Sequence, residues 1–417
     1  MPKVKIEKLV GGGQGLGRID GKAVFVWGAL AGEEVEVNIS KDKKNFSEGT
    51  AQEILVASKE RVAAKEEHYL SCSPWQILSW EEEMKWKKEI IKENFLRLAK
   101  MELPEFEVFG DKKSSYHYRN KIEYNLISDG KRVELAIFGR ETNELISIKE
   151  CCLAKKCLNE QAKKIVAWIN KRPDSERFKK IILQCNEQDE TLAVIFVDDK
   201  IAVEDGLMIS EKLNGVFVYQ LLNDGVAQLL FHEGKEFLTE KIMNVELRHA
   251  VNSFFQINIP IFCSALTDIS RFLAKENEVI DYYAGVGAIS LALAKHFARA
   301  ILVEGDQTAV ALAGKNIAAN KIYNCETVSG SVEKQTKLIT ARHVLILDPP
   351  RTGLSRDLIN QILFIKPRRL IYLSCDSATQ ARDIGLLSGK YRLIFTKAYN
   401  FFPRTPHVEC LCVLESK

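Results

Sequence analysis

The strongest constraint on the fold is a regular alternation of strand-like and helix-like segments in the last third of the chain, beginning near Val279. The apolar runs 300–303 and 344–347 have strand length, and the first of them precedes a helical pattern over 307–319. Strands that alternate with helices form βαβ units and a parallel sheet, which binds ligands at the carboxyl ends of its strands. The sequence therefore predicts an α/β domain of Rossmann-like type with a site at one sheet edge.

The first 57 residues differ in composition from the rest of the chain. Eight of the 24 glycines lie between Gly11 and Gly32, among short segments of alternating apolar and polar residues. Short strands with glycine turns predict a small β-barrel. The residues that follow mix a helical pattern over 80–100 with short strands and predict a central α+β region. We therefore expect three domains, over residues 1–57, 58–250 and 251–417.

Composition narrows the class of protein. The 417 residues are 46% hydrophobic and 28% charged, as in ordinary globular chains, and the net charge of +3 says little about partners. The longest uncharged apolar run, 284–294, is shorter than the ~18 residues of a membrane span, and no signal-type stretch follows Met1. Ten cysteines are too few for a disulfide scaffold. We expect a cytoplasmic monomer without a membrane span.

A glycine loop ends the first strand of the alternating region. Asp281 opens the run Asp-Tyr-Tyr-Ala-Gly-Val-Gly, and Glu304 ends the next strand. Glycines let the backbone approach a ligand, and an acidic residue at the second strand accepts hydrogen bonds from ribose hydroxyls. Ser290 replaces the third glycine of a dinucleotide fingerprint, which favours S-adenosylmethionine. A plain tight turn with an exposed glutamate is the alternative. We expect the helix after the loop to cover 288–298.

Three further strand ends carry side chains that could take part in catalysis. Asp348 precedes Pro349-Pro350-Arg351, Cys375 follows the strand 369–374, and Glu409 opens the apolar last strand. A cysteine that leads into a helix can have its thiolate stabilised by the helix N-terminus. A buried carboxylate is costly unless it is paired or used. The structural alternatives are a proline turn with a solvated ion pair, a packed cysteine and an edge-strand salt bridge.

Together these motifs resemble those of the RNA 5-methyluridine methyltransferases, a family of S-adenosylmethionine-dependent enzymes with the class I methyltransferase fold. The first 57 residues resemble the TRAM domain, an RNA-binding barrel that commonly precedes such enzymes. The resemblance implies Cys375 as nucleophile and Glu409 as general base. It also implies a cofactor site formed by Gln256 (in Phe255-Gln256-Ile257-Asn258), Tyr283, Glu304 and Asp348.

The chemistry of uracil methylation calls for the same residue types. Carbon-5 of uracil is a poor nucleophile toward a sulfonium methyl, and addition of a thiolate to carbon-6 makes it enolate-like. A base must then remove the carbon-5 proton so that the cysteine can leave. The target base must leave its stack, which suits single-stranded loops of RNA. We expect methylation of a uridine in tRNA or rRNA through a covalent cysteine adduct.

The sequence departs from the family at two places. Many members bind a [4Fe–4S] centre through a cysteine cluster, but here the region around Cys72 has a single cysteine, and Cys151, Cys152 and Cys157 lie together downstream. Four thiolates could formally be assembled, with three from one segment, which is not the family's arrangement. We therefore expect no iron–sulfur cluster and no other metal. Ala288 stands where the family often has Asn, so one cofactor contact is expected to be missing.

Two other functions compete with this reading. RNA 5-methylcytosine methyltransferases also use a cysteine at this strand end, but they typically carry a second cysteine after Asp-x-Pro, where this chain has Arg351. A non-catalytic RNA-binding protein with a methyltransferase fold is the other alternative. The presence of both Cys375 and Glu409 disfavours it.

Overall fold

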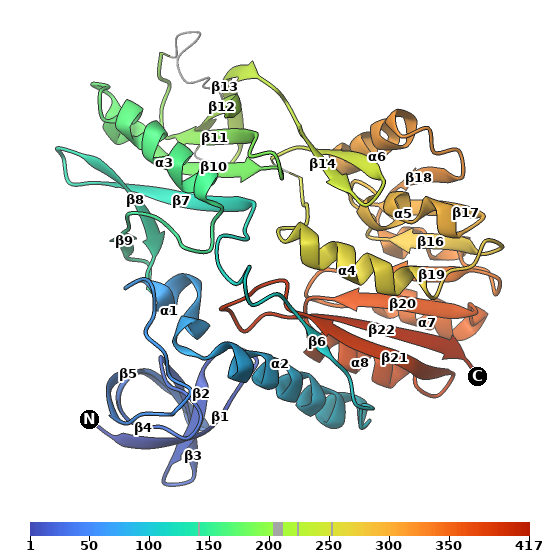
Figure 1. Cartoon of the computed structure of the whole chain (residues 1–417), viewed down its shortest axis with the longest axis horizontal. Coiled ribbons are helices and arrows are strands. Elements are labelled where there is room, and N and C mark those ends of the chain that lie inside the picture. Colours follow the sequence, from blue (N-terminus) through green and yellow to red (C-terminus); the bar gives the residue numbers. More distant parts are fainter. Residues whose placement is uncertain (141, 203–211, 223–224, 252) are drawn as a thin grey trace.

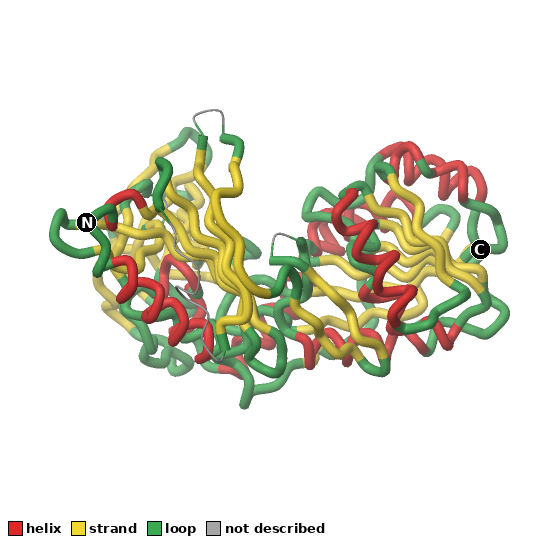
Figure 2. The backbone as a smooth tube through the Cα atoms, turned by 90° about the horizontal axis from the view of Figure 1, so that it is seen from above, coloured by secondary structure: helices red, strands yellow, loops and turns green. Residues whose placement is uncertain are grey.

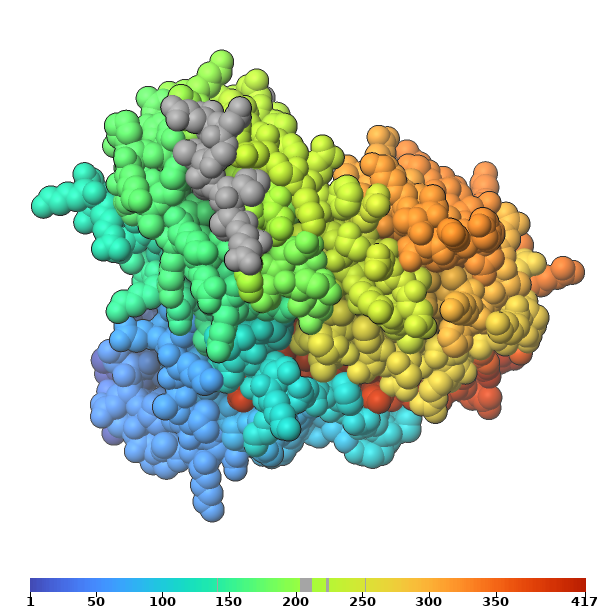
Figure 3. All heavy atoms as spheres, turned by 45° about the horizontal axis from the view of Figure 1, so that its top comes forward, coloured from blue at the N-terminus to red at the C-terminus, as the bar shows by residue number. Residues whose placement is uncertain are grey.

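The computed structural model describes residues 1–417 except 141, 203–211, 223–224 and 252. The chain forms a barrel, a central sheet and a larger C-terminal sheet, joined by helices that run between them (Figure 1). In the space-filling view the blue barrel lies against the green central part, and the orange C-terminal part lies on the other side (Figure 3). Within the described residues, no helix is long and apolar enough to cross a membrane.

The N-terminal part is a closed barrel, as expected, with the strand order β1-β2-β3-β5-β4. Alternate residues of its strands, among them Val4, Ile6, Val24 and Val35, point inward and form a small apolar core. The sequence did not indicate the first strand, which closes the barrel by pairing with both β2 and β4. The strands are β1 (Lys3–Leu9), β2 (Gly15–Ile19), β3 (Lys22–Trp27), β4 (Glu34–Asp42) and β5 (Phe46–Val56).

Helices lead from the barrel into the rest of the chain. Ser79 caps the long helix α2 by accepting a hydrogen bond from the backbone of Glu82, and a π-helical turn extends this helix. After this turn a short strand, β6, pairs with β21 of the C-terminal sheet. Residues within the predicted central region thus add an edge strand to the C-terminal sheet. The elements are α1 (Tyr69–Cys72), α2 (Trp80–Asn94), the π-turn (Phe95–Ala99) and β6 (Val108–Phe109).

The central part is a seven-stranded sheet with the order β13-β12-β11-β10-β7-β8-β9. Helix α3 covers one face, and its apolar stripe packs into the largest core of this part (Figure 1). Most of the pairs are antiparallel, and β11 and β12 run parallel. The elements are β7 (Lys121–Ser128), β8 (Val133–Phe138), β9 (Leu145–Ser147), α3 (Lys156–Ile169), β10 (Phe178–Cys185), β11 (Thr191–Val197), β12 (Leu213–Leu221) and β13 (Ala227–Gly234).

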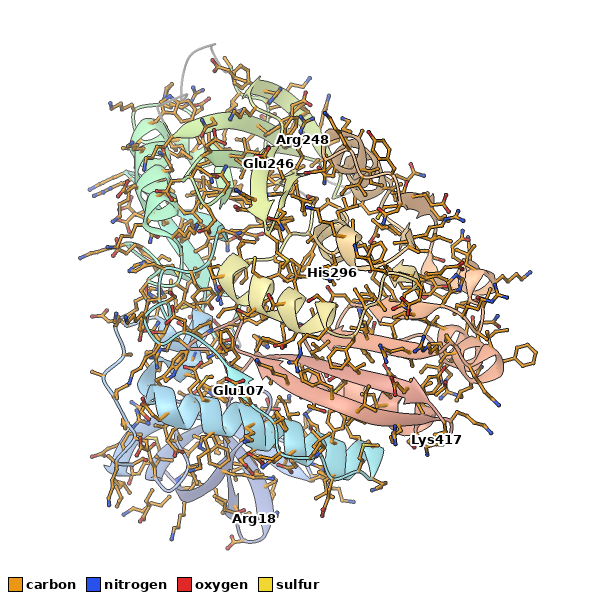
Figure 4. The ribbon with its side chains drawn as sticks, turned by 45° about the vertical axis from the view of Figure 1, so that its right-hand side comes forward. Arg18, Glu107, Glu246, Arg248, His296 and Lys417 are labelled. Atoms are coloured by element: carbon orange, nitrogen blue, oxygen red, sulfur yellow. The ribbon has the colours of Figure 1, made fainter. Side chains whose placement is uncertain are left out.

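A hairpin connects the central and C-terminal parts. It consists of β14 (Leu238–Ile242) and β15 (Val245–His249), and it docks on helix α6 (Gln307–Ala319). The backbone N–H groups of Glu246 and Arg248 donate to the side chains of Asn320 and Asn316. Figure 4 labels Glu246 and Arg248 on this hairpin. Side-chain amides of the helix thus continue the hydrogen bonding of the strand edge.

The C-terminal sheet has the order β18-β17-β16-β19-β20-β22-β21-β6. The five strands from β18 to β20 are parallel, which confirms the Rossmann-like prediction. Strand β22 runs antiparallel to both of its neighbours, β20 and β21. Its other elements are α4 (Ile259–Ser270), β16 (Glu278–Tyr282), α5 (Ala288–Ala292), β17 (Arg299–Glu304), β18 (Cys325–Ser329), β19 (Val344–Leu347), α7 (Arg356–Ile365), β20 (Arg369–Ser374), α8 (Ser377–Leu387), β21 (Tyr391–Tyr399) and β22 (Glu409–Ser416). Short 3₁₀ turns cover 74–77, 175–177, 294–296, 332–334 and 336–338.

The helix expected over 288–298 is shorter than predicted. Helix α5 ends at Ala292, and a 3₁₀ turn covers 294–296. The side-chain amide of Asn324 donates to the carbonyls of Ala294 and Phe297. In a continuing α-helix these carbonyls would instead accept backbone N–H groups of the next turn. The sequence pattern of 288–298 could not reveal that a side chain takes these carbonyls, because Asn324 lies in a different loop.

Candidate active site

The glycine loop leaves β16 in a strongly bent conformation. Tyr283, Gly285 and Gly287 all have positive φ, of 65°, 56° and 88°. A side chain at Gly287 would clash with Leu291, at 2.8 Å, and Leu302, at 3.0 Å, whereas the space beside Gly285 is open. Left-handed backbone at a residue with a side chain, here Tyr283, stores strain and is typical of binding loops. The loop therefore exposes its backbone to the space above the sheet edge.

Glu304 is held by the two loops that it separates. One carboxylate oxygen accepts the N–H of Gly285 at 2.9 Å, and the other accepts the N–H of Asp306 at 2.8 Å. Each oxygen keeps a further lone pair for a ligand. The expected acidic residue at the end of the second strand is therefore not a freely solvated side chain. It has a fixed position next to the glycine loop.

Carboxyl groups accumulate at the same sheet edge. Asp281 is buried at the end of β16, where one oxygen accepts the Ser290 hydroxyl at 2.6 Å and the other has no partner. Burial raises its pKa to about 7. Burial and the charge of Asp281 also raise the pKa of Asp348 to about 7. The site therefore holds more acidic groups than it can ionise, and a bound cation would stabilise their charged forms.

Glu409 belongs to this acidic group. Its side chain is buried, and one oxygen lacks a hydrogen-bond partner. Burial, followed by the charge of Asp348, raises its pKa well above the ordinary value, and Arg351 acts in the opposite direction. The backbone beside it is fixed because Gln380 donates to the carbonyl of Cys410 at 2.8 Å. Once the carboxyl group is ionised, its unpaired oxygen can accept a proton from a substrate.

Cys375 follows β20 at this edge and is half-buried. The expectation of a thiolate stabilised by the helix N-terminus is wrong for the protein without ligands. The side chain of Asp376 caps α8 and takes the N–H groups of Ala378 and Thr379. Burial, Glu409 and Asp348 raise the pKa of the thiol to about 12, and Arg351 opposes them only in part. The resting thiol is therefore protonated at neutral pH.

Most of the predicted site residues form one electrostatically linked group. Asp348, Cys375 and Glu409 interact with one another, and Asp281 links Asp348 to Glu304. Gln256 precedes α4 and is largely buried, and its carbonyl accepts the side-chain amide of Asn120 from the central part. Tyr283 stands in the strained loop, where burial raises its pKa.

Sequence reasoning missed a buried polar network that holds the loop before Glu409. Lys87 of α2 contacts Glu83 at 2.9 Å and Asn400 at 2.6 Å, and Glu83 accepts the backbone N–H of Arg404. The side chains of Glu83 and Lys87 are fully buried. Their spacing of four residues looks like a surface ion pair of a helix. The sequence carries no sign that their partners lie more than 300 residues away.

A second titratable cluster lies outside this site, where α1 meets the central part. It contains Glu66, His68 and Cys72, whose ligand atoms all lie within 4.8 Å of one another. The four cysteines that could formally bind an iron–sulfur cluster are not gathered here, because Cys157 instead lies beside Cys185, with which it interacts electrostatically. The residues present therefore do not fit a [4Fe–4S] centre.

Comparisons with known proteins agree with this picture. The family model described as tRNA (uracil-5-)-methyltransferase matches residues 79–345 and 338–417, and the TRAM domain model matches residues 3–51. A protein of Fusobacterium nucleatum named as an uncharacterised RNA methyltransferase is 28% identical over 100% of this chain and 96% of its own. A similarly named protein of Aquifex aeolicus is 26% identical over 100% of this chain and 98% of its own.

Among solved structures, the tRNA (uracil-54, C5)-methyltransferase of Pyrococcus abyssi in complex with S-adenosyl-L-homocysteine has the same fold. Its TM-score is 0.80 at 23% identity, with 99% of this chain and 100% of that chain covered. The predicted fold class, the TRAM barrel and the resemblance to RNA methyltransferases are thereby confirmed. The chain belongs to the tRNA (uracil-5-)-methyltransferase family.

Proposed function

We propose that this protein transfers a methyl group from S-adenosylmethionine to carbon-5 of a uridine in tRNA or rRNA, with Cys375 as nucleophile and Glu409 as general base. The observation that carries the proposal is the position of the Cys375 thiol beside the buried, partly unpaired carboxyl of Glu409. A thiol and a carboxyl group are the pair that methylation at carbon-5 needs.

The site suits a sulfonium cosubstrate, which supplies the electrophilic methyl group. The carboxyl groups of Asp281 and Asp348 give the sheet edge an affinity for positive charge, and the space beside Gly285 admits a ligand close to the backbone. The fixed carboxylate of Glu304 has lone pairs left for ribose hydroxyls. We assign Gln256 and Tyr283 to the same cosubstrate site.

The residues then act in order. Cys375 loses its proton to water and its sulfur bonds to carbon-6, so that carbon-5 gains the electron density with which it bonds to the methyl group; the bond from the methyl group to the cosubstrate's sulfur would break and leave a neutral thioether. Glu409 as carboxylate removes the proton from carbon-5, the bond from carbon-6 to sulfur breaks, and the thiolate is restored. A cation bound beside Asp348 and Glu409 before methyl transfer would lower the pKa of each and so favour the carboxylate form of Glu409.

We assign RNA binding to the barrel and to the face of the central sheet that α3 leaves uncovered. This face carries a row of stacked rings, in which Phe217 lies 4.3 Å from His232 and 6.5 Å from Tyr219. Phe196 extends the row, and Lys180 lies over its ring. Aromatic rows with nearby cations are typical platforms for unstacked bases. In Figure 2 the strands of this sheet form one wall of the left-hand lobe.

The test is chemical analysis of RNA from a strain that lacks this protein. Mass spectrometry of its nucleosides should show the loss of 5-methyluridine at one position, restored by the purified protein with S-adenosylmethionine. Loss of 5-methylcytosine instead would contradict the proposal. RNA with 5-fluorouridine at the same position should trap the Cys375 adduct, because the fluorine cannot leave as a proton does.

A further inference from the structure

We propose that Glu66, His68, Cys72 and Cys151 form a site for one divalent transition-metal ion of the zinc type, at the junction between the barrel and the central sheet. The ligand atoms of the first three lie within 4.8 Å of one another. Ligands of a tetrahedral zinc ion lie about 3.5 Å apart, as follows from bonds of about 2.0–2.3 Å. Small side-chain rotations therefore suffice to bring these atoms around an ion.

Cys151 supplies the fourth ligand. It is buried and lies close enough to the Cys72 thiol and the His68 ring to interact electrostatically with both. Two thiolates, one imidazole and one carboxylate oxygen form a donor set that zinc prefers over harder cations such as magnesium or calcium. The set has two sulfur ligands, which is half of what a [4Fe–4S] cluster needs.

An unsatisfied ring nitrogen points to a missing ligand independently of the spacing. The Nε2 atom of His68 is buried without a hydrogen-bond partner, and the side chain is only 10% exposed. It lies 3.4 Å from a carboxylate oxygen of Glu66, outside hydrogen-bonding geometry. Buried polar atoms almost always have partners, and a metal ion at this point would provide one.

A second layer of hydrogen bonds orients the carboxylate. Gln76 donates to one oxygen of Glu66 at 3.0 Å and to the Ser73 hydroxyl at 2.6 Å, while the other oxygen of Glu66 accepts the backbone N–H of Cys152. Such outer contacts fix the ligands of metal sites and raise their affinity. One oxygen of Glu66 is thus turned toward His68 and Cys72.

The charges balance when one dication is bound. Arg119 lies close enough to Cys72 and Cys151 to interact with both electrostatically, and its buried Nε has no partner. Two thiolates and the Glu66 carboxylate carry three negative charges, which a dication and the guanidinium neutralise. A neutral assembly avoids the large cost of burying unpaired charge. Binding releases the thiol protons to water and involves no oxidation.

The site also has an entry path. A groove of about 1120 Å³ runs past it and is lined by Glu66, His68 and Cys152. An ion bound there would tie the segment that follows the barrel to the central part, through His68 and Cys72 on one side and Cys151 on the other. We therefore infer a structural role for the ion, separate from the reaction.

The experiment is a cobalt(II) and zinc titration of the reduced full chain. One cobalt ion per chain should bind with a thiolate-to-metal charge-transfer band, and one zinc ion should displace it. Zinc should raise the melting temperature by several degrees, since a ligand of the folded state alone stabilises it. A wild-type chain that shows no such band, or that carries about four irons and four sulfides, would overturn the proposal.

Variants locate the site. Cys72→Ser should abolish the charge-transfer band and the stabilisation by zinc, and His68→Gln should weaken zinc binding at least tenfold. Cys263→Ser, at another half-buried cysteine on α4, is the matched control and should bind as the wild type does. Circular dichroism checks that each variant is folded. An unchanged band in folded Cys72→Ser would refute the assignment of the ligands.

Discussion

The Nζ atom of Lys87 lies 2.6 Å from the side-chain oxygen of Asn400, although 313 residues separate the two in the chain. The contact joins helix α2 to the loop that leads to Glu409. Because Lys87 also pairs with Glu83 and contacts the carbonyl of Phe402, its charge is compensated although its side chain is fully buried. The position of the proposed base therefore depends on a residue in the first quarter of the chain.

Removal of this cation should destabilise the protein strongly. Lys87→Met leaves the buried carboxyl of Glu83 with Arg404, at 3.6 Å, as its remaining cation, and breaking a buried ion pair typically costs up to about 3–5 kcal/mol. Urea unfolding should show a large drop in midpoint. Lys85→Met, which removes an exposed partner of Glu82 on the same helix, is the control and should leave the midpoint unchanged. Equal midpoints for the two variants would show that the buried network contributes little.

Glu304→Ala should weaken the binding of S-adenosylmethionine. The variant removes hydrogen bonds from a charged acceptor, each worth about 1.5–3 kcal/mol, so the affinity should fall about tenfold to a hundredfold. Calorimetry measures this directly. Glu326→Ala, on the neighbouring strand β18 and paired with Arg299 at the surface, should bind as tightly as the wild type. If Glu304→Ala also did so, Glu304 would not belong to the site.

The two groups assigned to catalysis should fail differently. In the proposed mechanism Cys375 acts before methyl transfer, so Cys375→Ala should form neither adduct nor product. Glu409 is proposed to act afterwards, so Glu409→Gln should methylate the base and then stall. Loss of a general base slows a step about 10²–10⁴-fold, enough for the methylated protein–RNA adduct to accumulate on a denaturing gel. Wild-type turnover by Glu409→Gln would move the base elsewhere.

The reactivity of Cys375 should rise steeply with pH in the free enzyme. Its pKa is raised to about 12, so at neutral pH only a small fraction is thiolate, and each pH unit below the pKa should change the alkylation rate tenfold. Iodoacetamide labelling followed by mass spectrometry measures this rate. Asp348→Asn removes a negative neighbour and should speed labelling, whereas Arg351→Ala should slow it. A rate independent of pH near neutrality would show that the thiol is already ionised.

The aromatic row should contribute to RNA affinity. A base stacked on an aromatic side chain is worth about 1–3 kcal/mol, so Phe217→Ala should weaken RNA binding about fivefold to a hundredfold. Fluorescence anisotropy with a labelled RNA loop would detect the change, while binding of S-adenosylmethionine stays constant. Tyr323→Ala, at an exposed ring beyond α6, serves as control. Equal RNA affinity in both variants would exclude the sheet face from the interface.

The sequence predicted the parts of the fold that local patterns govern. The segments α6, β19 and β20 have the bounds that their sequence patterns indicate. Strand β6 was not predictable, because two residues carry no period and their pairing partner, β21, lies almost 300 residues away. For the same reason the sequence placed the residues before β6 with the central region, whereas their contacts extend to the C-terminal sheet.

The candidate site was predictable in composition but not in its electrostatics. The residue types at the strand ends identified Asp348 and Cys375, because parallel strands place their carboxyl ends at one edge. Glu409 reaches the same edge because it opens β22, which runs antiparallel to β20. The raised pKa of Cys375 depends on burial and on which acidic groups face it, which only the folded chain determines. The side chain of Asp376 caps α8 and takes the helix N–H groups that the sequence prediction had left for the thiolate.

Trp75 joins the barrel to the same loop that Lys87 holds. Its indole N–H donates to the carbonyl of Gly13 in the barrel, and its backbone N–H donates to the carbonyl of Arg404. Deleting the barrel would therefore remove one of the contacts that position the loop before Glu409, as well as the proposed RNA-binding surface. Activity lost on truncation could not be attributed to weaker RNA capture alone, and point substitutions on the outer strands of the barrel are the appropriate way to separate the two effects.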